Sequence, residues 1–365
     1  MTIFYDHQIF SLQNFGGASR LFAELIYNIN HDHKALAHLS ILYHNNAHLG
    51  EKNLATSAFD KIPLPSKKGI VRQLNHFYNV LDISYRSFDI YHPTYYDCTY
   101  LKHSRGKPTV ITFLDMIHEK FGQIFPEIRA DLGVVAQKRE MAKSSTHIIA
   151  ISESTKKDIV ELYDIDPSKI TVIHLGSAFG NVKKAEDRVD DSRPFLLYVG
   201  NRDAYKNFQP MLKAIAKILV RENISLICAG GKAFTPEEIS LIDSLKVRHL
   251  VRHEIIDDKK LASLYARAVA FIFPSLYEGF GIPILEAFSC NCPCIVSNTS
   301  SLPEVGGEAV LYIDPADERS ITGAVDKILS DTDLRNSLIK KGRERLKHFS
   351  WEKMTQQTLN VYNKL

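Results

Sequence analysis

Apolar residues follow two different spacings along the chain, and the two spacings alternate. Short runs rich in β-branched and aromatic residues predict buried strands. In the first half these runs occupy residues 2–6, 35–43, 88–93, 109–113, 146–152 and 170–175. Longer segments with apolar residues three or four positions apart predict helices, at residues 16–29, 69–81, 126–143 and 153–163. Such alternation indicates parallel sheets with helices on both faces.

The pattern is interrupted once and then resumes. Between residues 176 and 193 small, polar and charged residues replace the apolar ones, which predicts a surface linker. A second series of strands then occupies residues 195–200, 224–231, 251–255, 269–275, 292–298 and 309–315. The α/β pattern predicts two Rossmann-like doubly wound domains facing across a cleft, at residues 1–180 and 193–349. We expect a last helix at about residues 350–365 to pack back on the first domain.

Composition excludes some classes of partner. With 45% hydrophobic and 24% charged residues, the chain has the composition of an ordinary soluble globular protein. The net charge of +3 is small, and no arginine-rich run is interleaved with aromatic residues, so we expect no nucleic acid partner. No window is apolar enough to predict a membrane-spanning helix, and the first residues do not resemble a secretory leader. We therefore expect a cytoplasmic protein.

Cysteines and acidic pairs give no metal-binding pattern. The number of cysteines is odd, which favours reduced thiols over a disulfide framework; they are Cys98, Cys228, Cys290, Cys292 and Cys294. The close spacing in "CNCPC" matches no common zinc site. Asp164 and Asp166 form the motif D-x-D, but they stand directly before Pro167 and are typical of a turn.

Two cations stand in the segment "VGNRDAYKNF", between the first strand of the second domain and the helix that follows. Arg202 and Lys206 would meet there with the amide groups of the helix N-terminus. Cations and free amides together favour an anion, most simply a phosphate or diphosphate. The alternative is solvated surface charge in an ordinary loop.

Two carboxylates bracket the segment "EGFGIPILE". Gly281 and Pro283 are typical of a helix start, and the helix surrounds Glu286 with apolar neighbours. An unpartnered buried carboxylate costs several kcal/mol, roughly, so Glu286 should meet a donor or a cation. It is suited to accept hydrogen bonds from two vicinal hydroxyls of a ribose, with Glu278 nearer the phosphates. The alternative is a buried ion pair with a core arginine.

The first domain contains weaker signals. Gly16 and Gly17 precede a helix, where backbone amides can approach a phosphate or a sugar. Ser152 is typical of an N-cap and is also a candidate for a contact in the cleft. Lys67 and Lys68 precede a helix with an apolar face. That helix is either an ordinary surface helix with a basic side or one that rests on an anionic membrane and meets a lipid-linked acceptor.

Taken together, these motifs resemble the retaining glycosyltransferases of family 4, which have the GT-B fold. The two carboxylates match the family's E-x7-E signature, with "GFG" between them and "PS" before them. The segments "YVGNRDAYKN" and "TSSLPEVGGEAVLYIDPAD" are similar to the family's donor-phosphate loop and to its characteristic later segment. In the first domain "DHQIFSLQNFGGASR", "VITFLDMIHEKF" and "AISESTKKDI" also match. The resemblance covers nearly the whole chain.

The resemblance implies roles for individual residues. Arg202 and Lys206 would stabilise the charge that grows on the donor diphosphate, and Glu278 would contact the transferred sugar. The implied donor-binding residues are Gly16, Gly17, Gly200, Asn207, Gly279, Phe280, Gly281, Glu286, Ser301 and Leu302. The family needs no divalent metal, so the resemblance implies neither a metal nor another cofactor.

The sequence departs from the family at one position. Many relatives have a histidine before the aspartate that follows the fourth strand, whereas this chain has Leu114 before Asp115. Asp115 remains a catalytic candidate. Either His118 reaches the space of the missing histidine, or the donor sugar is held without that contact. His118 and Ser152 are therefore candidates for a contact with acceptor or sugar.

The resemblance implies a retaining transferase that moves a hexose, such as mannose or a related sugar, from a nucleotide diphosphate sugar to a glycan or lipid-linked saccharide. The donor would be a UDP-, GDP- or ADP-sugar, and the setting bacterial surface polysaccharide or lipopolysaccharide synthesis. Peripheral contact with the inner face of the membrane is a further expectation. Two alternatives remain open, a nucleotide-sugar epimerase of the same fold and a non-catalytic nucleotide-sugar-binding scaffold.

Overall fold

The computed structural model describes residues 1–32, 35–54, 67–125, 128, 132–177, 179 and 193–365. The chain forms two compact units. The first unit combines Met1–Gly122, Ile128–Leu175 and Ser350–Leu365, and the second combines Gln123–Glu127 with Gly176–Phe349. The segment predicted to be a linker lies largely outside the described residues.

The first unit contains two parallel sheets whose strands follow the predicted order. One sheet has the order β2-β1-β3 and the other β4-β5-β6. The strands are β1 (Thr2–Tyr5), β2 (Leu36–Leu39), β3 (Ile90–His92), β4 (Val110–Phe113), β5 (His147–Ala150) and β6 (Ile170–Val172). A bridge between Tyr91 and Thr109 joins the sheets. Each of the six predicted strands is present, because each run is apolar enough to be buried.

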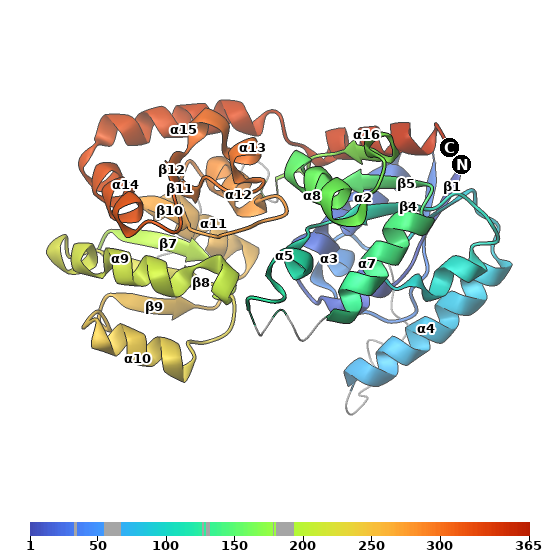
Figure 1. The fold of residues 1–365 in the computed structure, drawn as a ribbon, viewed down its shortest axis with the longest axis horizontal. Coiled ribbons are helices and arrows are strands. Elements are labelled where there is room, and N and C mark those ends of the chain that lie inside the picture. The colour runs from blue at the N-terminus through green and yellow to red at the C-terminus, as the bar shows by residue number, and fades with distance from the viewer. Residues whose placement is uncertain (33–34, 55–66, 126–127, 129–131, 178, 180–192) are drawn as a thin grey trace. The chain divides into compact units, whose positions relative to one another are not determined.

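Helices pack around these sheets (Figure 1). They are α1 (Gln8–Leu12), α2 (Gly17–Asp32), α3 (Ala47–Glu51), α4 (Lys67–Tyr85), α5 (Ile117–Phe121), α7 (Leu132–Ser144), α8 (Glu153–Tyr163) and α16 (Trp351–Tyr362), with the 3-10 turns η1 (Cys98–His103) and η2 (Pro167–Lys169). The sequence pattern predicts the long helices, but α1, α3 and α5 are too short for an apolar period to reveal them. Asp164 ends α8 in the left-handed conformation and Asp166 caps η2, so the predicted turn there is confirmed.

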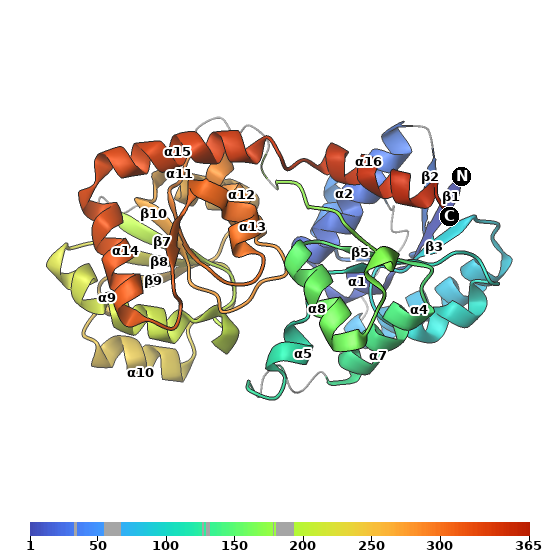
Figure 2. The same ribbon diagram turned by 45° about the horizontal axis from the view of Figure 1, so that its top comes forward.

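The C-terminal helix α16 belongs to the first unit and lies along α2 (Figure 2). Its last residue, Tyr362, is buried. The Tyr362 hydroxyl is hydrogen-bonded to the Tyr5 hydroxyl at 2.7 Å and to Nδ1 of His92. Nε2 of His92 is in turn hydrogen-bonded to Thr112 at 2.9 Å. The end of the chain therefore joins three strands of the first unit.

The second unit has one six-stranded parallel sheet with the order β12-β11-β10-β7-β8-β9. Its strands are β7 (Phe195–Val199), β8 (Ser225–Ala229), β9 (Val251–Glu254), β10 (Ala270–Phe273), β11 (Cys294–Ser297) and β12 (Leu311–Ile313). This is the order of a Rossmann sheet, in which successive strands are added on one side of β7 up to β9 and on its other side from β10 onward, so that the switch point lies between β7 and β10. Ligands of such sheets bind outside the carboxyl ends of the strands at this switch point.

Helices of the second unit cover both faces of this sheet. They are α9 (Phe208–Arg221), α10 (Pro236–Ser244), α11 (Asp258–Arg267), α12 (Ile282–Ser289), α13 (Leu302–Gly306), α14 (Glu318–Ser330) and α15 (Thr332–Leu346), with the turns η3 (Ala204–Lys206) and η4 (Gly307–Ala309). Side chains of α9 and α14 pack in one core with β7, β8 and β10. The five cysteines of the chain are free, which confirms the prediction of reduced thiols.

Candidate active site

The loop after β7 turns sharply to deliver Lys206. Gly200 adopts a φ of 114° and Asn207 a φ of 58°, and the left-handed region favours glycine and asparagine. The Asn207 side-chain amide also donates a hydrogen bond to the Pro315 carbonyl at 2.7 Å. The chain is thereby fixed on both sides of Lys206. This position is at the carboxyl end of β7, beside the switch point.

Hydrogen bonds join the loops that follow β7, β10 and β11. The amide of Leu276 donates to the Tyr205 carbonyl at 2.8 Å. The amide of Glu278 donates to the Ser300 hydroxyl at 2.9 Å, and the Ser301 hydroxyl donates to the Glu278 carbonyl at 2.8 Å. Ser301 thus has a clear structural role. Three loops that are distant in sequence form one polar edge of the sheet.

Lys206 and Glu278 are brought together at this edge. The Nζ atom of Lys206 lies 2.6 Å from Oε1 of Glu278, and their side chains are 18% and 11% exposed. Burial lowers the pKa of Lys206, but Glu278, Tyr205 and Asp203 together raise it by more, so the net pKa lies above the ordinary value. Lys206 is therefore charged at neutral pH. The pair places a cation and a carboxylate at the carboxyl end of the sheet, beside the switch point.

Arg202 lies elsewhere. Its Nε donates to Oε1 of Glu238 at 2.8 Å, and its side chain is only 4% exposed. The guanidinium also donates to the Lys232 and Ala233 carbonyls and lies over the Phe234 ring. The sequence predicts that Arg202 and Lys206 meet at one point, but in the structure each is paired with a different carboxylate. The catalytic role of Arg202 stays a prediction, and Lys206 is the more accessible cation.

Glu286 lies in α12, where the sequence predicts a helix. The helix starts after Gly281, whose φ is 111°, and Pro283 stands in its first turn. Glu286 is 9% exposed, and its Oε2 accepts a hydrogen bond from the Tyr265 hydroxyl at 3.3 Å. A Cβ atom at position 281 would lie 3.0 Å from the Leu302 side chain, so glycine allows the start of α13 to approach.

The glycines of the first unit stand at the start of α2. Gly17 begins the helix, and a Cβ at Gly16 would lie 2.5 Å from Oε1 of Gln13. That Gln13 oxygen accepts a hydrogen bond from the amide of Ser19 at 3.2 Å. Gly16 thus makes room for a side chain that caps α2, a role that the glycine pattern alone does not reveal.

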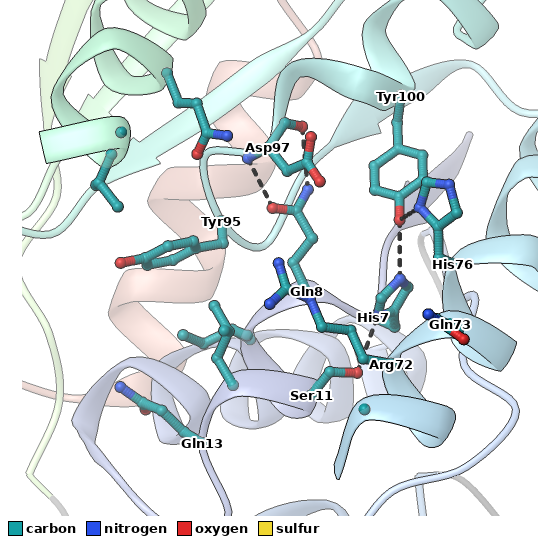
Figure 3. Close-up of a pocket in the computed structure, with 16 residues that line it drawn as sticks. His7, Gln8, Ser11, Gln13, Arg72, Gln73, His76, Tyr95, Asp97 and Tyr100 are labelled. Carbon is teal, nitrogen blue, oxygen red and sulfur yellow. Dashed lines mark hydrogen bonds between the residues drawn. The ribbon is translucent and has the colours of Figure 1, made fainter. Parts of the chain in front are cut away.

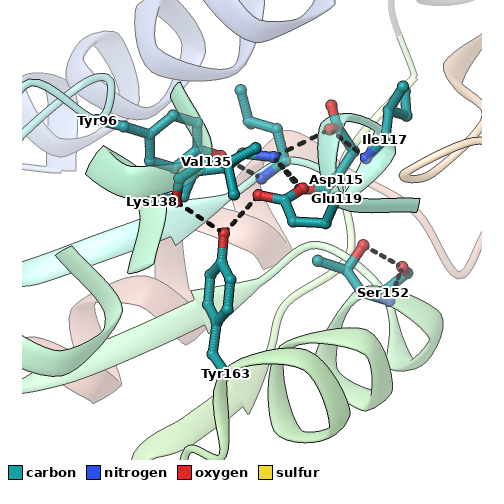
Figure 4. A network of polar contacts seen from close by, with 10 residues as sticks. Tyr96, Asp115, Ile117, Glu119, Val135, Lys138, Ser152 and Tyr163 are labelled. Carbon is teal, nitrogen blue, oxygen red and sulfur yellow. Dashed lines mark hydrogen bonds and ion pairs between the residues drawn. The ribbon is translucent and has the colours of Figure 1, made fainter. Parts of the chain in front are cut away.

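Asp115 is part of a buried polar network (Figure 4). Nζ of Lys138 lies 3.4 Å from Oδ1 of Asp115 and 3.1 Å from Oε2 of Glu119. The Tyr163 hydroxyl donates to the other oxygen of Glu119. Burial raises the pKa of Asp115, but the Lys138 ammonium, the Ile117 amide and His118 together lower it more, so the net pKa lies below its ordinary value. Asp115 is therefore a carboxylate at neutral pH.

His118 and Ser152, the candidates for a sugar contact, lie in defined elements. His118 is in α5, three residues after Asp115, and contributes to the lowered pKa of that carboxyl. Ser152 is the N-cap of α8 and accepts a hydrogen bond from the Thr155 amide at 3.0 Å. The predicted cap is confirmed, whereas the predicted sugar contacts of both residues stay predictions.

The first unit also contains a cavity of about 870 Å³ (Figure 3). Its lining joins α1, α4, η1 and α7 and combines polar with aromatic side chains: His7, Gln8, Ser11, Gln13, Arg72, Gln73, His76, Tyr95, Asp97, Tyr100 and Gln137. The Tyr100 hydroxyl is hydrogen-bonded to Nε2 of His7 at 3.0 Å and to Nδ1 of His76 at 2.8 Å. Amides, imidazoles and tyrosines of this kind can bind sugar hydroxyls.

Comparison with known proteins assigns both halves of the chain. The family model described as "Glycosyltransferase Family 4" matches residues 12–177, and the model described as "Glycosyl transferases group 1" matches residues 181–345. The "O-antigen chain mannosyltransferase B" of Escherichia coli is 30% identical over 278 residues, covering 73% of this chain and 72% of that protein. The chain belongs to glycosyltransferase family 4.

Two further comparisons agree with this assignment. The "MMP alpha-(1->4)-mannosyltransferase" of Mycolicibacterium hassiacum is 28% identical over 245 residues, which cover 66% of this chain and 59% of that protein. The solved structure of a sucrose-phosphate synthase from Thermosynechococcus elongatus superposes with a TM-score of 0.78 at 19% identity, covering 100% of this chain and 98% of that one. The glycosyltransferase therefore has the GT-B fold. These comparisons favour neither the epimerase nor the scaffold.

The described residues contain neither a candidate metal cluster nor a helix that could span a membrane. No group of three or more histidine, cysteine, aspartate or glutamate side chains is arranged there to hold a metal ion. In the same part of the glycosyltransferase, no helix has both the length and the apolar composition needed to cross a bilayer.

Several residues of the site are not among those that the sequence predicts. Glu238 and Lys138 hold Arg202 and Asp115 by ion pairs, and each stands in a helical segment where a charge is ordinary. His7 and Tyr100 of the cavity were missed because their elements are short. The capping motif "TPEE" at the start of α10 was the one available signal for Glu238, since it predicts a glutamate turned back toward the helix start.

Proposed function

We propose that this glycosyltransferase moves a hexose, mannose or a related sugar, from a nucleotide diphosphate sugar to a glycan or lipid-linked saccharide with retention of configuration. We further propose that it acts in bacterial surface polysaccharide or lipopolysaccharide synthesis. Membership of family 4 supports the reaction class. The names of two relatives, both mannosyltransferases, support the sugar, and the O-antigen relative supports the setting.

The observation that carries this proposal is the Lys206–Glu278 pair at the switch point of the second unit. As the bond between the anomeric carbon and the diphosphate breaks, negative charge grows on the leaving oxygen. Lys206 would stabilise that charge, and Glu278 would accept hydrogen bonds from hydroxyls of the sugar. The acceptor oxygen would form the new bond on the same face, and its proton would pass to the leaving diphosphate.

The resemblance to the family supplies the roles that we propose for the remaining residues. Glu286 would accept hydrogen bonds from the ribose hydroxyls, close to the backbone of Ser301 and Leu302. Because Lys206 supplies positive charge, we propose that the reaction needs no divalent metal or other cofactor. The polar cavity of the first unit supports binding of the acceptor saccharide there.

A thermal-shift panel tests this function. The full chain is heated with UDP, GDP, ADP and their hexose derivatives, with and without EDTA. We expect one nucleotide series to raise Tm, because a ligand that binds only the folded state stabilises it, and EDTA to leave the shift unchanged. A response to none of the nucleotides would contradict the proposed function, and a shift abolished by EDTA would contradict the metal-independent mechanism.

A further inference from the structure

Helix α15 supports both helices that carry the proposed donor residues. Gly342 of α15 is buried against α12, and a Cβ atom at this position would lie 2.8 Å from the Phe288 ring. Glycine therefore allows the two helices to approach closely. Farther along α15, Arg345 reaches α13 and lies over Phe349, the last residue of the second unit. Figure 1 and Figure 2 both show α12 and α13 beside α15.

Arg345 holds the C-terminal end of α13. Its Nε donates a hydrogen bond to the Val305 carbonyl at 3.1 Å, and its Nη2 donates to the Glu304 carbonyl. The last carbonyls of a helix have no partner within the helix and carry partial negative charge, so a cation stabilises them. Gly307, with a φ of 52°, leaves room for this guanidinium, since a Cβ atom there would lie 3.2 Å from Nε of Arg345.

The other end of α13 is fixed to the loop that carries Glu278. The Ser301 hydroxyl donates to the Glu278 carbonyl at 2.8 Å and to the Phe280 carbonyl at 2.9 Å. The neighbouring Ser300 adopts a left-handed φ of 50°, and its hydroxyl accepts a hydrogen bond from the Glu278 amide at 2.9 Å. A shift of α13 would therefore also move the loop that contains Glu278 and Phe280.

Phe349 closes these contacts into a ring. It is buried, and its side chain packs edge-on against Phe280, with the ring centroids 5.9 Å apart. The Arg345 guanidinium lies over the Phe349 ring, 5.1 Å from its centroid, which is a favourable cation–π distance. Arg345 thus supports α13 directly and the loop of Phe280 through Phe349. We call Arg345 and Phe349 the α15 brace.

We propose that the α15 brace positions the donor-binding loops: it holds Glu278 and the backbone of Ser301 and Leu302 in the arrangement that a nucleotide diphosphate sugar requires, without touching that ligand. A binding site works only when its groups are held within about 0.5 Å of the productive geometry, so residues behind the loops determine the affinity. Both members of the brace are positioning residues. The inference rests on the proposed function, which assigns the donor to these loops.

The competing interpretation is that the brace only stabilises the second unit, and α15 contains a matched control for it. Arg335 donates from Nη1 to the carbonyls of Ile328 and Leu329 at 2.6 and 3.0 Å, near the C-terminal end of α14. Arg335 and Arg345 are both partly exposed, and both bind carbonyls at the end of a helix. Arg335, however, supports α14, which carries none of the proposed donor residues.

Hydrogen exchange of the unliganded full chain tests the positioning. We expect Arg345→Ala to speed amide exchange in residues 276–283 and 299–307 by about tenfold or more, because two hydrogen bonds from a charged donor no longer hold these loops closed. Arg345→Lys keeps the cation and should restore part of the protection, whereas Arg335→Ala should leave both segments unchanged. Equal exchange in Arg345→Ala and the unaltered protein would overturn the inference.

Calorimetric titration with UDP, GDP and ADP connects the brace to the donor. For the nucleotide that binds the unaltered protein, we expect Kd to rise about tenfold in Arg345→Ala and in Phe349→Leu, and to stay unchanged in Arg335→Ala. Urea unfolding checks that all variants are folded. An unchanged Kd in Arg345→Ala, with stability lowered as in Arg335→Ala, would show that the brace only stabilises the unit. No binding of any nucleotide to the unaltered protein would instead contradict the proposed function, and with it the donor role of the brace.

Discussion

At the scale of single residues, two cations of the same loop have different partners. Lys206 lies beside Glu278 at the sheet edge, whereas Arg202 is enclosed by Glu238 and backbone carbonyls. The sequence places both cations in one loop but gives no sign of this division. Only the fold determines which carboxylate each cation contacts, because Glu238 belongs to helix α10 and Glu278 to the loop that follows β10.

For Lys206→Ala we expect kcat to fall by about a hundredfold or more, since charge on the leaving diphosphate loses its cation. Initial rates at saturating donor measure the effect. The control Lys213→Ala removes an exposed lysine of α9 and should leave kcat unchanged. A Lys206→Ala protein with normal kcat would show that the ion pair with Glu278 is only structural.

For Arg202→Ala we expect a loss of about 3 kcal/mol in the free energy of unfolding, because Glu238 becomes a buried carboxylate without its cation. Urea unfolding measures it. The second change Glu238→Gln removes the charge but keeps an acceptor for the Thr235 amide, so the double variant should regain part of the stability. Full stability with lost kcat in Arg202→Ala would instead support a direct catalytic role.

At the scale of elements, the docking of α16 on the sheets of the first unit should be sensitive to acid. Burial lowers the pKa of His92 from 6.5 to about 3. The folded state therefore binds fewer protons than the unfolded state between these values, and stability falls as the pH falls through this window. At pH 5 this difference in bound protons lowers the free energy of unfolding by about 2 kcal/mol.

Unfolding free energies measured from pH 7 to pH 5 test this expectation. In His92→Gln the decrease in stability toward pH 5 should be smaller by that amount, whereas His31→Gln, which changes an exposed histidine, should follow the unaltered protein. Identical pH profiles for His92→Gln and the unaltered protein would show that His92 is not held neutral in the folded state.

The elements also show how far the sequence determines the fold. Long helices and buried strands are predictable because their apolar periods are local. The carboxylate in α12 is predictable too, since an acidic residue among Ile284, Leu285 and Phe288 stands out. The cavity is not, because its wall combines residues from α1, α4, η1 and α7 whose individual types are ordinary. The sequence does not show which elements pack side by side, so it does not reveal a cavity whose wall is formed by several of them.

At the scale of the whole molecule, the chemistry is divided between two units. The Lys206–Glu278 pair lies in the second unit, at the switch point of its sheet. The polar cavity lies in the first unit. Under the proposed function, the second unit has the more regular motifs because a diphosphate needs fixed backbone geometry, whereas the requirements of an acceptor saccharide would be spread over many side chains.

The position of α16 also has a consequence for biosynthesis. Tyr5 and His92 acquire their partner Tyr362 only after α16 has been synthesised. Multidomain chains generally fold from the N-terminus onward as they are made. Here β1 and β3 are made before most of the second unit, whereas α16, which completes their hydrogen bonds, is made after it. The second unit therefore has all of its own residues before the first unit does.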